Sequence, residues 1–212
     1  MQLKAPQPGD PRIKLRAQLL LMSAPMARPW LVSGSATTDA ISGASAAYHS
    51  SILGPMQDRQ TLLARRSHHR DSAGSTARWS WRNCSDNCGV HAHTLGLERV
   101  QPLADGWTIT PLARLYTRSA ARSYMPAGEA DSPLAPNPSA DAVYTTEDQR
   151  LSAYGGRTWG LKLARLWASG RQDDIKFERY AQRSAWRLFG SGSTGLTPFR
   201  ARSLQLGVSH PF

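Results

Sequence analysis

Apolar and polar residues alternate along the segment from Phe199 to Phe212. The apolar members are Leu204, Leu206, Val208 and the final Phe212, and small or polar residues stand between them. Successive side chains of a β-strand point to opposite faces, so this segment would present one apolar and one polar face. The pattern is typical of the closing strand of a transmembrane β-barrel, in which a lipid face and a lumen face alternate.

Similar alternation recurs along most of the chain and predicts about eight strands. These segments begin near residues 12, 30, 75, 91, 107, 154, 175 and 199. Asp105-Gly106, which stands between two of them, is a strong hairpin signal. Short turns alternate with longer connections, as in barrels with tight periplasmic turns and larger external loops. The predicted fold is therefore all-β: an antiparallel up-and-down transmembrane β-barrel, either complete or incomplete. A soluble β-sandwich or soluble barrel also alternates and stays open.

We expect one domain over residues 1–212. It would contain an N-terminal hairpin over residues 12–42, a loop-rich segment over 43–74 and the remaining strands over 75–212. Within the last part, the polar, proline-containing residues 125–146 are expected to form a long outer loop. Residues 17–27 loosely resemble the end of a signal peptide, but their apolar core is short and alternates, so we expect no clear export signal in this chain.

The chain is strongly basic, with 26 Lys and Arg against 15 Asp and Glu and a formal net charge of +11. Such a charge ordinarily suggests nucleic acid or an anionic surface as the partner. Most of the arginines instead recur singly at even spacing, as in Arg114, Arg118 and Arg122, which is typical of one face of a strand. No window holds the roughly 18 uninterrupted apolar residues of a membrane helix, so a membrane-spanning form would have to be a closed barrel. We expect no nucleic-acid partner, and a soluble polyanion-binding β-protein is the alternative.

Five stretches of the chain are distinctive: residues 38–49 (TDAISGASAAYH), 91–111 (HAHTLGLERVQPLADGWTITP), 149–163 (QRLSAYGGRTWGLKL), 176–188 (KFERYAQRSAWRL) and the ending from Gly195. They resemble a bacterial family catalogued as a domain of unknown function (three-five-seven-zero), whose members are regarded as outer-membrane β-barrels. The resemblance implies an outer-membrane location, with membrane lipid and the barrel-assembly machinery as partners. Homo-oligomerisation stays open.

The chain also departs from the pattern of that family. Its members usually carry several more hairpins between the ISGAS and HTLGLE segments, so this chain resembles a truncated barrel without a central block. Arg99 stands where an aromatic residue would suit the lipid face, and Pro211 interrupts the last strand. A charge facing lipid costs about 2–4 kcal/mol at the bilayer midplane and much less near the interface. A non-functional truncated fragment is therefore a further alternative.

Candidate chemistry is sparse. Cys84, Cys88, His91 and His93 form a C-x3-C-x2-H-x-H pattern, with Cys84 expected in the turn before the histidine strand. Zinc can take two cysteines and two histidines, but this spacing fits known zinc sites poorly. A local disulfide is a second interpretation, and two incidental cysteines are the third, which we prefer. No phosphate loop, nucleophile elbow or metal-binding helix motif is found, so we expect no catalytic residue, no metal, no cofactor and no enzymatic activity.

Two basic groups are candidates for binding. Residues 59–71 (RQTLLARRSHHRD) fit a short helix or a basic loop, and the His68-His69 pair with its neighbouring arginines could hold a phosphate or a lipopolysaccharide headgroup. A solvated basic loop is the favoured interpretation. The candidates for lumen-facing residues are Arg78, Arg82, Arg114, Arg118 and Lys162.

Charged residues that face a lumen tune the selectivity of a pore. The acidic residues Glu98, Asp174 and Glu178 could instead pair with these cations and form a salt-bridged plug. An eight-stranded barrel is just wide enough for side chains to fill it. The predicted function is a porin-like or structural role without catalysis, such as passage of a small anionic solute.

Overall fold

The chain is built from nine β-strands. The computed structural model describes residues 14–26, 30–42, 57–125 and 148–210. The strands are β1 (Lys14–Pro25), β2 (Trp30–Ser42), β3 (Gln57–Arg70), β4 (Ser75–Asp86), β5 (His91–Pro102), β6 (Trp107–Arg118), β7 (Tyr154–Leu166), β8 (Gln172–Arg183) and β9 (Phe199–Ser209). All nine form a single sheet in sequence order, and each neighbouring pair is antiparallel. The predicted all-β, up-and-down, antiparallel architecture is confirmed.

Helical structure in the described residues is limited to four single turns of 3-10 helix: η1 (Asp71–Ala73), η2 (Ala104–Gly106), η3 (Gln149–Leu151) and η4 (Ser184–Trp186). In this part of the chain, no helix is long and apolar enough to cross a membrane. The predicted Asp105-Gly106 turn is present, with both residues at positive φ. The expected loop over residues 125–146 lies almost entirely outside the described residues.

The strand count exceeds the predicted eight because β3 occupies part of the segment that was expected to be rich in loops. The prediction of a helix or a basic loop over residues 59–71 is wrong. Leu62 and Leu63 are adjacent, so the two-residue period that marks a strand is hidden there. The strand forms because β2 and β4 pair with it on both sides and satisfy its backbone groups.

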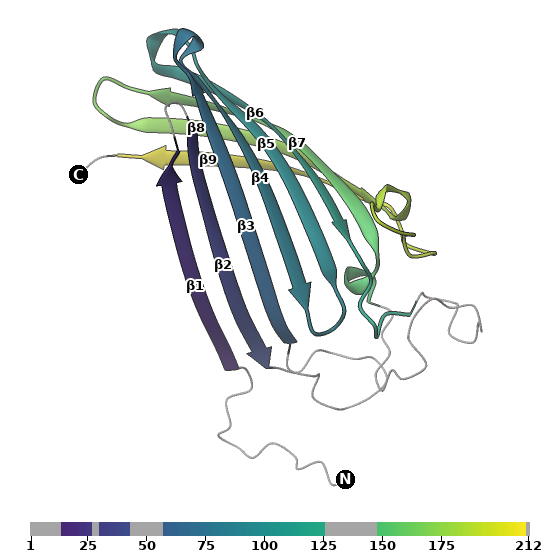
Figure 1. The fold of residues 1–212 in the computed structure, drawn as a ribbon. Helices are drawn as coiled ribbons and strands as arrows, with labels where there is room; N and C mark the ends of the chain where they lie inside the picture. The colour runs from purple at the N-terminus through teal and green to yellow at the C-terminus, as the bar shows by residue number, and fades with distance from the viewer. Residues whose placement is uncertain (1–13, 27–29, 43–56, 126–147, 211–212) are drawn as a thin grey trace, which may run out of the picture.

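The two ends of the sheet differ in their connections. The segments that join β3 to β4, β5 to β6 and β7 to β8 are short, and we call this end the turn end; η1 marks it at the top of Figure 1. The connections from β6 to β7 and from β8 to β9 lie at the opposite end, which we call the loop end. These two connections are much longer, as the sequence predicted, whereas the β4–β5 connection at the same end is short.

The sheet is strongly curved and open (Figure 1). Among the described residues, β1 pairs only with β2 and β9 only with β8. The closing pair that the sequence predicted for the last strand is therefore not formed, and Phe212 lies outside the described residues. Both edge strands run from the loop end to the turn end, because nine strands alternate in direction. A direct β1–β9 pair would be parallel, unlike every other pair in the sheet.

Register gives the sheet two distinct faces. Partners that lie directly opposite in neighbouring strands point to the same side, as do alternate residues within a strand. One side, the apolar face, carries Trp79, Trp81, Leu95, Leu97, Ala113 and Leu115 at its centre. The other side, the polar face, carries Arg78, Arg82, Glu98, Arg114, Lys162 and Glu178.

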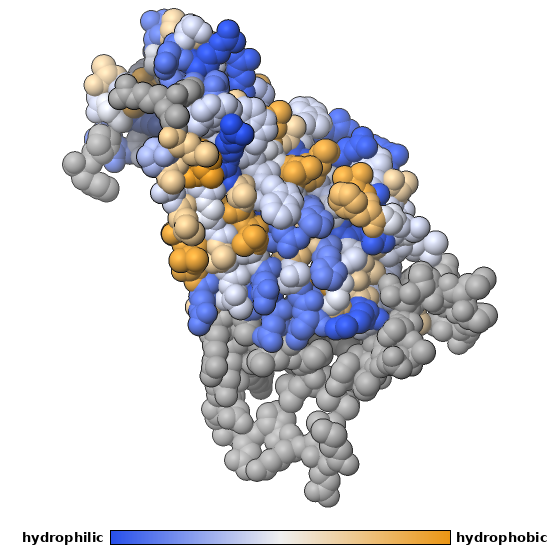
Figure 2. All heavy atoms as spheres, viewed as in Figure 1, coloured by the Kyte–Doolittle hydropathy of each residue, from blue (hydrophilic) through white to orange (hydrophobic). Residues whose placement is uncertain are grey.

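The apolar face is largely uncovered. Leu95 and Trp159 are 49% and 52% exposed, and Leu206 on β9 is 77% exposed. Hydrophobic residues gather across the middle of the molecule in Figure 2, whereas the upper end is mostly hydrophilic. The cluster of buried apolar residues lies instead among the loop-end connections, where Val90, Ala121 and Tyr124 pack together. The sheet is thus a single layer, without a second layer of described structure over its apolar face.

Candidate functional site

The polar face brings the five predicted lumen candidates onto one side of the sheet. Arg78 and Arg82 lie on β4, Arg114 and Arg118 on β6, and Lys162 on β7. Even spacing within each strand and the register between strands place them together. Whether this face lines a lumen stays a prediction, because the described strands do not close around it.

Acidic residues interleave with these cations near β7 and β8. Lys162 Nζ lies 3.3 Å from Asp174 Oδ2, and Lys176 Nζ lies 3.1 Å from Glu178 Oε1. Arg114 Nη2 is 3.9 Å from the same Glu178 oxygen. The two lysines stand directly opposite each other on β7 and β8. The carboxylates offset the repulsion expected between them. Two of the three acidic residues that the sequence offered as partners therefore pair with cations.

Two hollows indent the polar face. One, of about 610 Å³, lies towards the turn end and is lined by Arg78, Glu98, Lys162 and Asp174 among others. The second, of about 510 Å³, lies towards the loop end, with Arg82, Arg114 and Tyr180 in its wall. Both are open to the space in front of the sheet. Arg78 and Arg82 take part in none of the ion pairs among the described residues, so this face keeps an excess of positive charge.

Arg118 lies apart from the other candidates. It is at the loop end of β6, where its Nη1 donates a hydrogen bond of 2.6 Å to the carbonyl oxygen of Arg150. Its guanidinium also approaches the ring of Tyr154. These contacts hold the segment around Arg150 against the strands. The Arg118 side chain therefore stabilises the loop end and also contributes positive charge.

Glycines make room for larger neighbours on the polar face. A Cβ atom on Gly160 would lie 2.6 Å from the carbonyl oxygen of Phe177 and 2.8 Å from Cγ of Glu178. A Cβ on Gly96 would meet the Ser80 hydroxyl at 2.5 Å. Small residues facing large ones are typical of a barrel interior filled by side chains.

The cysteine and histidine pattern does not assemble into a site. Cys84 lies within β4 on the polar face, and not in the turn as predicted, whereas His93 points to the apolar face. Among the described residues, no group of three or more potential ligands could hold a metal ion. Both cysteines are free thiols. Burial, followed by the nearby carboxylate of Asp86, raises the pKa of the Cys88 thiol.

The basic run on β3 is divided between the two faces. Arg66 and His68 point to the apolar face, while Arg65 and His69 point to the polar face. On the apolar face, the guanidinium of Arg66 stacks 3.7 Å above the ring of Trp30. The hypothesis of one phosphate site built from this run is therefore not supported by its geometry, because adjacent strand residues point in opposite directions.

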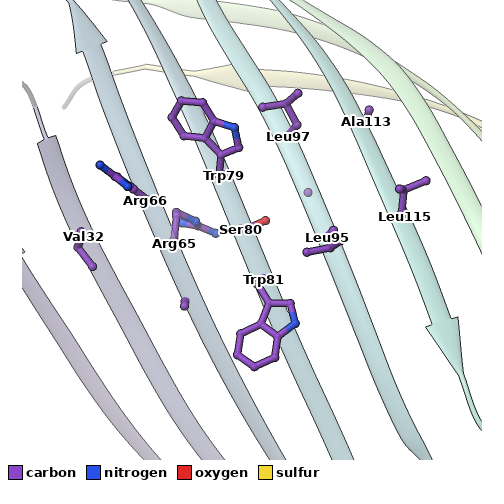
Figure 3. A pocket seen from close by; sticks show the side chains of 12 residues that line it. Val32, Arg65, Arg66, Trp79, Ser80, Trp81, Leu95, Leu97, Ala113 and Leu115 are labelled. Atoms are coloured by element: carbon purple, nitrogen blue, oxygen red, sulfur yellow. The ribbon is translucent and has the colours of Figure 1, made fainter. Parts of the chain in front are cut away.

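The centre of the apolar face is a shallow hollow lined by tryptophan and leucine. In Figure 3, Trp79 and Trp81 stand on β4 beside Leu95 and Leu97 on the next strand, and Ala113 and Leu115 follow on β6. Across β7, β8 and β9 the apolar band continues in the register row of Leu161, Phe177 and Leu204, which starts from Pro111 of β6, one step nearer the turn end than Ala113.

Tryptophan–arginine pairs border the apolar face at both ends. At the turn end, the guanidinium of Arg165 lies 3.8 Å from the ring centre of Trp167 and 5.2 Å from that of Trp107. At the loop end, Arg157 lies 4.3 Å above Trp186. On β7, the nine residues from Arg157 to Arg165 span the distance between the two borders. A tilted transmembrane strand uses about 9–11 residues to cross the hydrocarbon layer, and aromatic girdles flank the apolar band of such barrels.

Arg99 also lies on the apolar face, towards the turn end. This is the face that the sequence analysis assigned to Arg99.

These features define an all-β protein with a single curved, two-faced sheet. A model of the family described as "Protein of unknown function (DUF3570)" matches residues 55–201. The chain belongs to this family. The match begins just before β3 and runs into β9, so the ISGAS segment lies outside it. Searches of the curated proteins and of the solved structures find no match to this chain.

Proposed function

We propose that this chain is a non-enzymatic outer-membrane β-barrel protein whose apolar face contacts lipid and whose polar face lines the interior. The observation that carries the proposal is the uncovered apolar face. A soluble domain buries such a face against a second layer, and contiguous exposed apolar patches mark interaction surfaces. Here Trp79, Leu97 and Leu161 are each more than 40% exposed. The apolar band and its aromatic borders match the dimensions of a bilayer.

The interior of such a barrel would be rich in charge. The polar face combines unpaired arginines with a ladder of ion pairs, and charged linings of this kind set ion selectivity. We infer a structural role or passage of a small anionic solute.

The unpaired outer edges of β1 and β9 must also be covered, because exposed edge strands recruit further strands. Bacterial barrels have even strand numbers, so the nine described strands need an odd number of additional strands for antiparallel closure, and the nine strands of a second copy of this chain would meet this requirement.

The orientation of the sheet follows from its connections. Barrels of this class carry short periplasmic turns and longer extracellular loops. We therefore expect the loop end to face the outside of the cell. In a Cys84→Ser/Cys88→Ser background, Ser191→Cys at the loop end should react with a membrane-impermeant maleimide in intact cells. Ser72→Cys at the turn end should react only after lysis; both serines are exposed. Labelling of Ser72→Cys alone in intact cells would contradict the orientation, and recovery of both variants in the soluble fraction would contradict the membrane location.

Anion passage has a separate electrical test. In a planar bilayer under a KCl gradient, the reconstituted protein should show a reversal potential on the anion-selective side. The double variant Arg78→Gln/Arg82→Gln should shift it towards the cation-selective side, because two unpaired interior charges are lost. The control, Arg66→Gln/Arg99→Gln, removes two charges from the apolar face and should leave the selectivity unchanged. Absence of any conductance would contradict solute passage and leave the structural role.

A further inference from the structure

Five arginines gather on the apolar face at the loop end of β7, β8 and β9. They are Arg157, Arg179, Arg183, Arg200 and Arg202. The register places Arg179 directly opposite Arg202, and it places Arg157 and Arg200 on either side of Ala181. We call this group the arginine patch. The sequence shows these residues at even spacing among apolar ones, but only the pairing of the strands brings them together.

The patch has no acidic partners among the described residues. None of the ion pairs found there includes a patch arginine. Of the acidic residues of β8, Asp174 and Glu178 point to the polar face, and Asp173, on the apolar face at the turn end, pairs with Arg171. Like charges on facing positions of neighbouring strands are destabilising. A cluster of this kind is therefore stabilised when an external anion supplies the missing charge.

An aromatic side chain supports the patch. The guanidinium groups of Arg157 and Arg183 lie 4.3 and 5.1 Å from the ring of Trp186 in η4. Stacking on a ring leaves the N–H groups at the edge of a guanidinium free to donate. Arginine donors match phosphate oxygens in a two-point geometry, which makes this residue well suited to phosphate recognition.

The patch directly adjoins the apolar band. The register row that contains Arg179 and Arg202 is followed, towards the turn end, by the row of Leu161, Phe177 and Leu204. A ligand that fills both rows must combine an anionic group with a hydrocarbon chain. A free phosphate would contact only the arginine row. A nucleic acid has no acyl chain to contact the apolar row.

We propose that the arginine patch binds the phosphate groups of an anionic membrane lipid at the loop end of the barrel. This inference rests on the proposed function, because it requires the apolar face to contact lipid. Basic residues near a membrane surface each contribute about 1 kcal/mol to the attraction for anionic lipid. Removing two of the five should therefore weaken binding about thirtyfold.

The test uses the full chain folded in uncharged dodecyl maltoside micelles. Phosphatidic acid is titrated into these micelles, with zwitterionic phosphatidylcholine as the comparison lipid of zero net charge, and binding is followed by calorimetry. The wild type should prefer phosphatidic acid. Arg200→Gln/Arg202→Gln, on the exposed edge strand, should lose about thirtyfold in affinity. Arg66→Gln/Arg99→Gln, which removes the same charge from the same face outside the patch, should bind like the wild type.

Several results would overturn the inference. Equal binding by the patch variant and the wild type would do so, as would equal binding of the two lipids. Competition by inorganic phosphate or by a single-stranded oligonucleotide at concentrations similar to that of the lipid would show a free phosphate or a nucleic acid as the ligand instead. If the protein folds in micelles but shows no preference for phosphatidic acid, the lipid-binding inference is wrong and the proposed function still stands. Failure to fold in micelles defeats the proposed function, and the inference with it.

Discussion

Replacing Leu206 with arginine is expected to destabilise the micelle-folded protein by about 2–4 kcal/mol, the cost of a lipid-facing arginine near the bilayer midplane. Leu206 lies in the middle of the apolar run of β9, between Leu204 and Val208 and opposite Ile175. Its side chain is 77% exposed. In water, an exposed surface position of this kind tolerates substitution within about 0.5 kcal/mol. The substitution therefore separates a lipid-facing strand from a solvated one, and urea unfolding in micelles measures the difference.

Ser203→Arg is the matched control. It lies on the same strand, is also exposed, and points to the polar face opposite Glu178. A new guanidinium there meets a carboxylate and water, so we expect a change of less than about 0.5 kcal/mol. Equal, small effects of the two substitutions would show that both faces are solvated and would contradict contact between the apolar face and lipid.

Tyr124→Ala is expected to cost about 3–5 kcal/mol, the range found when a large buried aromatic side chain is removed. Tyr124 is 2% exposed and packs with Val90 and Ala121. Backbone hydrogen bonds tie this cluster to two further segments, from Ala121 N–H to the oxygen of Leu151 and from Arg122 N–H to that of Cys88. Loss of the ring should therefore loosen the loop end while the strands stay paired.

Limited proteolysis and urea unfolding in micelles together measure this effect. The variant should be cleaved faster in the loop-end connections and should unfold at a lower urea concentration than the wild type. Phe189→Ala serves as the control, because Phe189 is 81% exposed in a loop at the same end. If the two aromatic substitutions had equal effects, the buried cluster would not be what holds the loop end together.

Local alternation in the sequence was enough to predict most of the sheet. β7 and β9 follow directly from Trp159, Leu161 and Leu163 and from Leu204, Leu206 and Val208, because each set repeats every second residue. β3 was missed where two leucines are adjacent. In β1, Leu19 to Met22 are consecutive apolar residues, so the alternation that predicted this edge strand ends there and both faces are apolar over these four residues.

The site depended on information that a single strand does not contain. Evenly spaced arginines on β4 and β6 indicated a shared face, and the sequence also supplied their acidic partners. The contact of Lys162 with Asp174, however, follows from the register between β7 and β8. The arginine patch likewise arises only when three strands are aligned, so alternation within one strand could not reveal it. A strand pattern also shows that one face is apolar without showing what covers that face.

The most direct test of the lipid-facing sheet is refolding of the purified chain into detergent micelles, followed by gel electrophoresis with and without boiling. We predict a β-rich species whose migration changes on boiling, because a barrel closed between copies of this chain resists unfolding by the gel detergent at room temperature. A folded monomer that is stable in water without detergent would contradict contact between the apolar face and lipid. Persistent aggregation in micelles would contradict a barrel that this chain can form by itself.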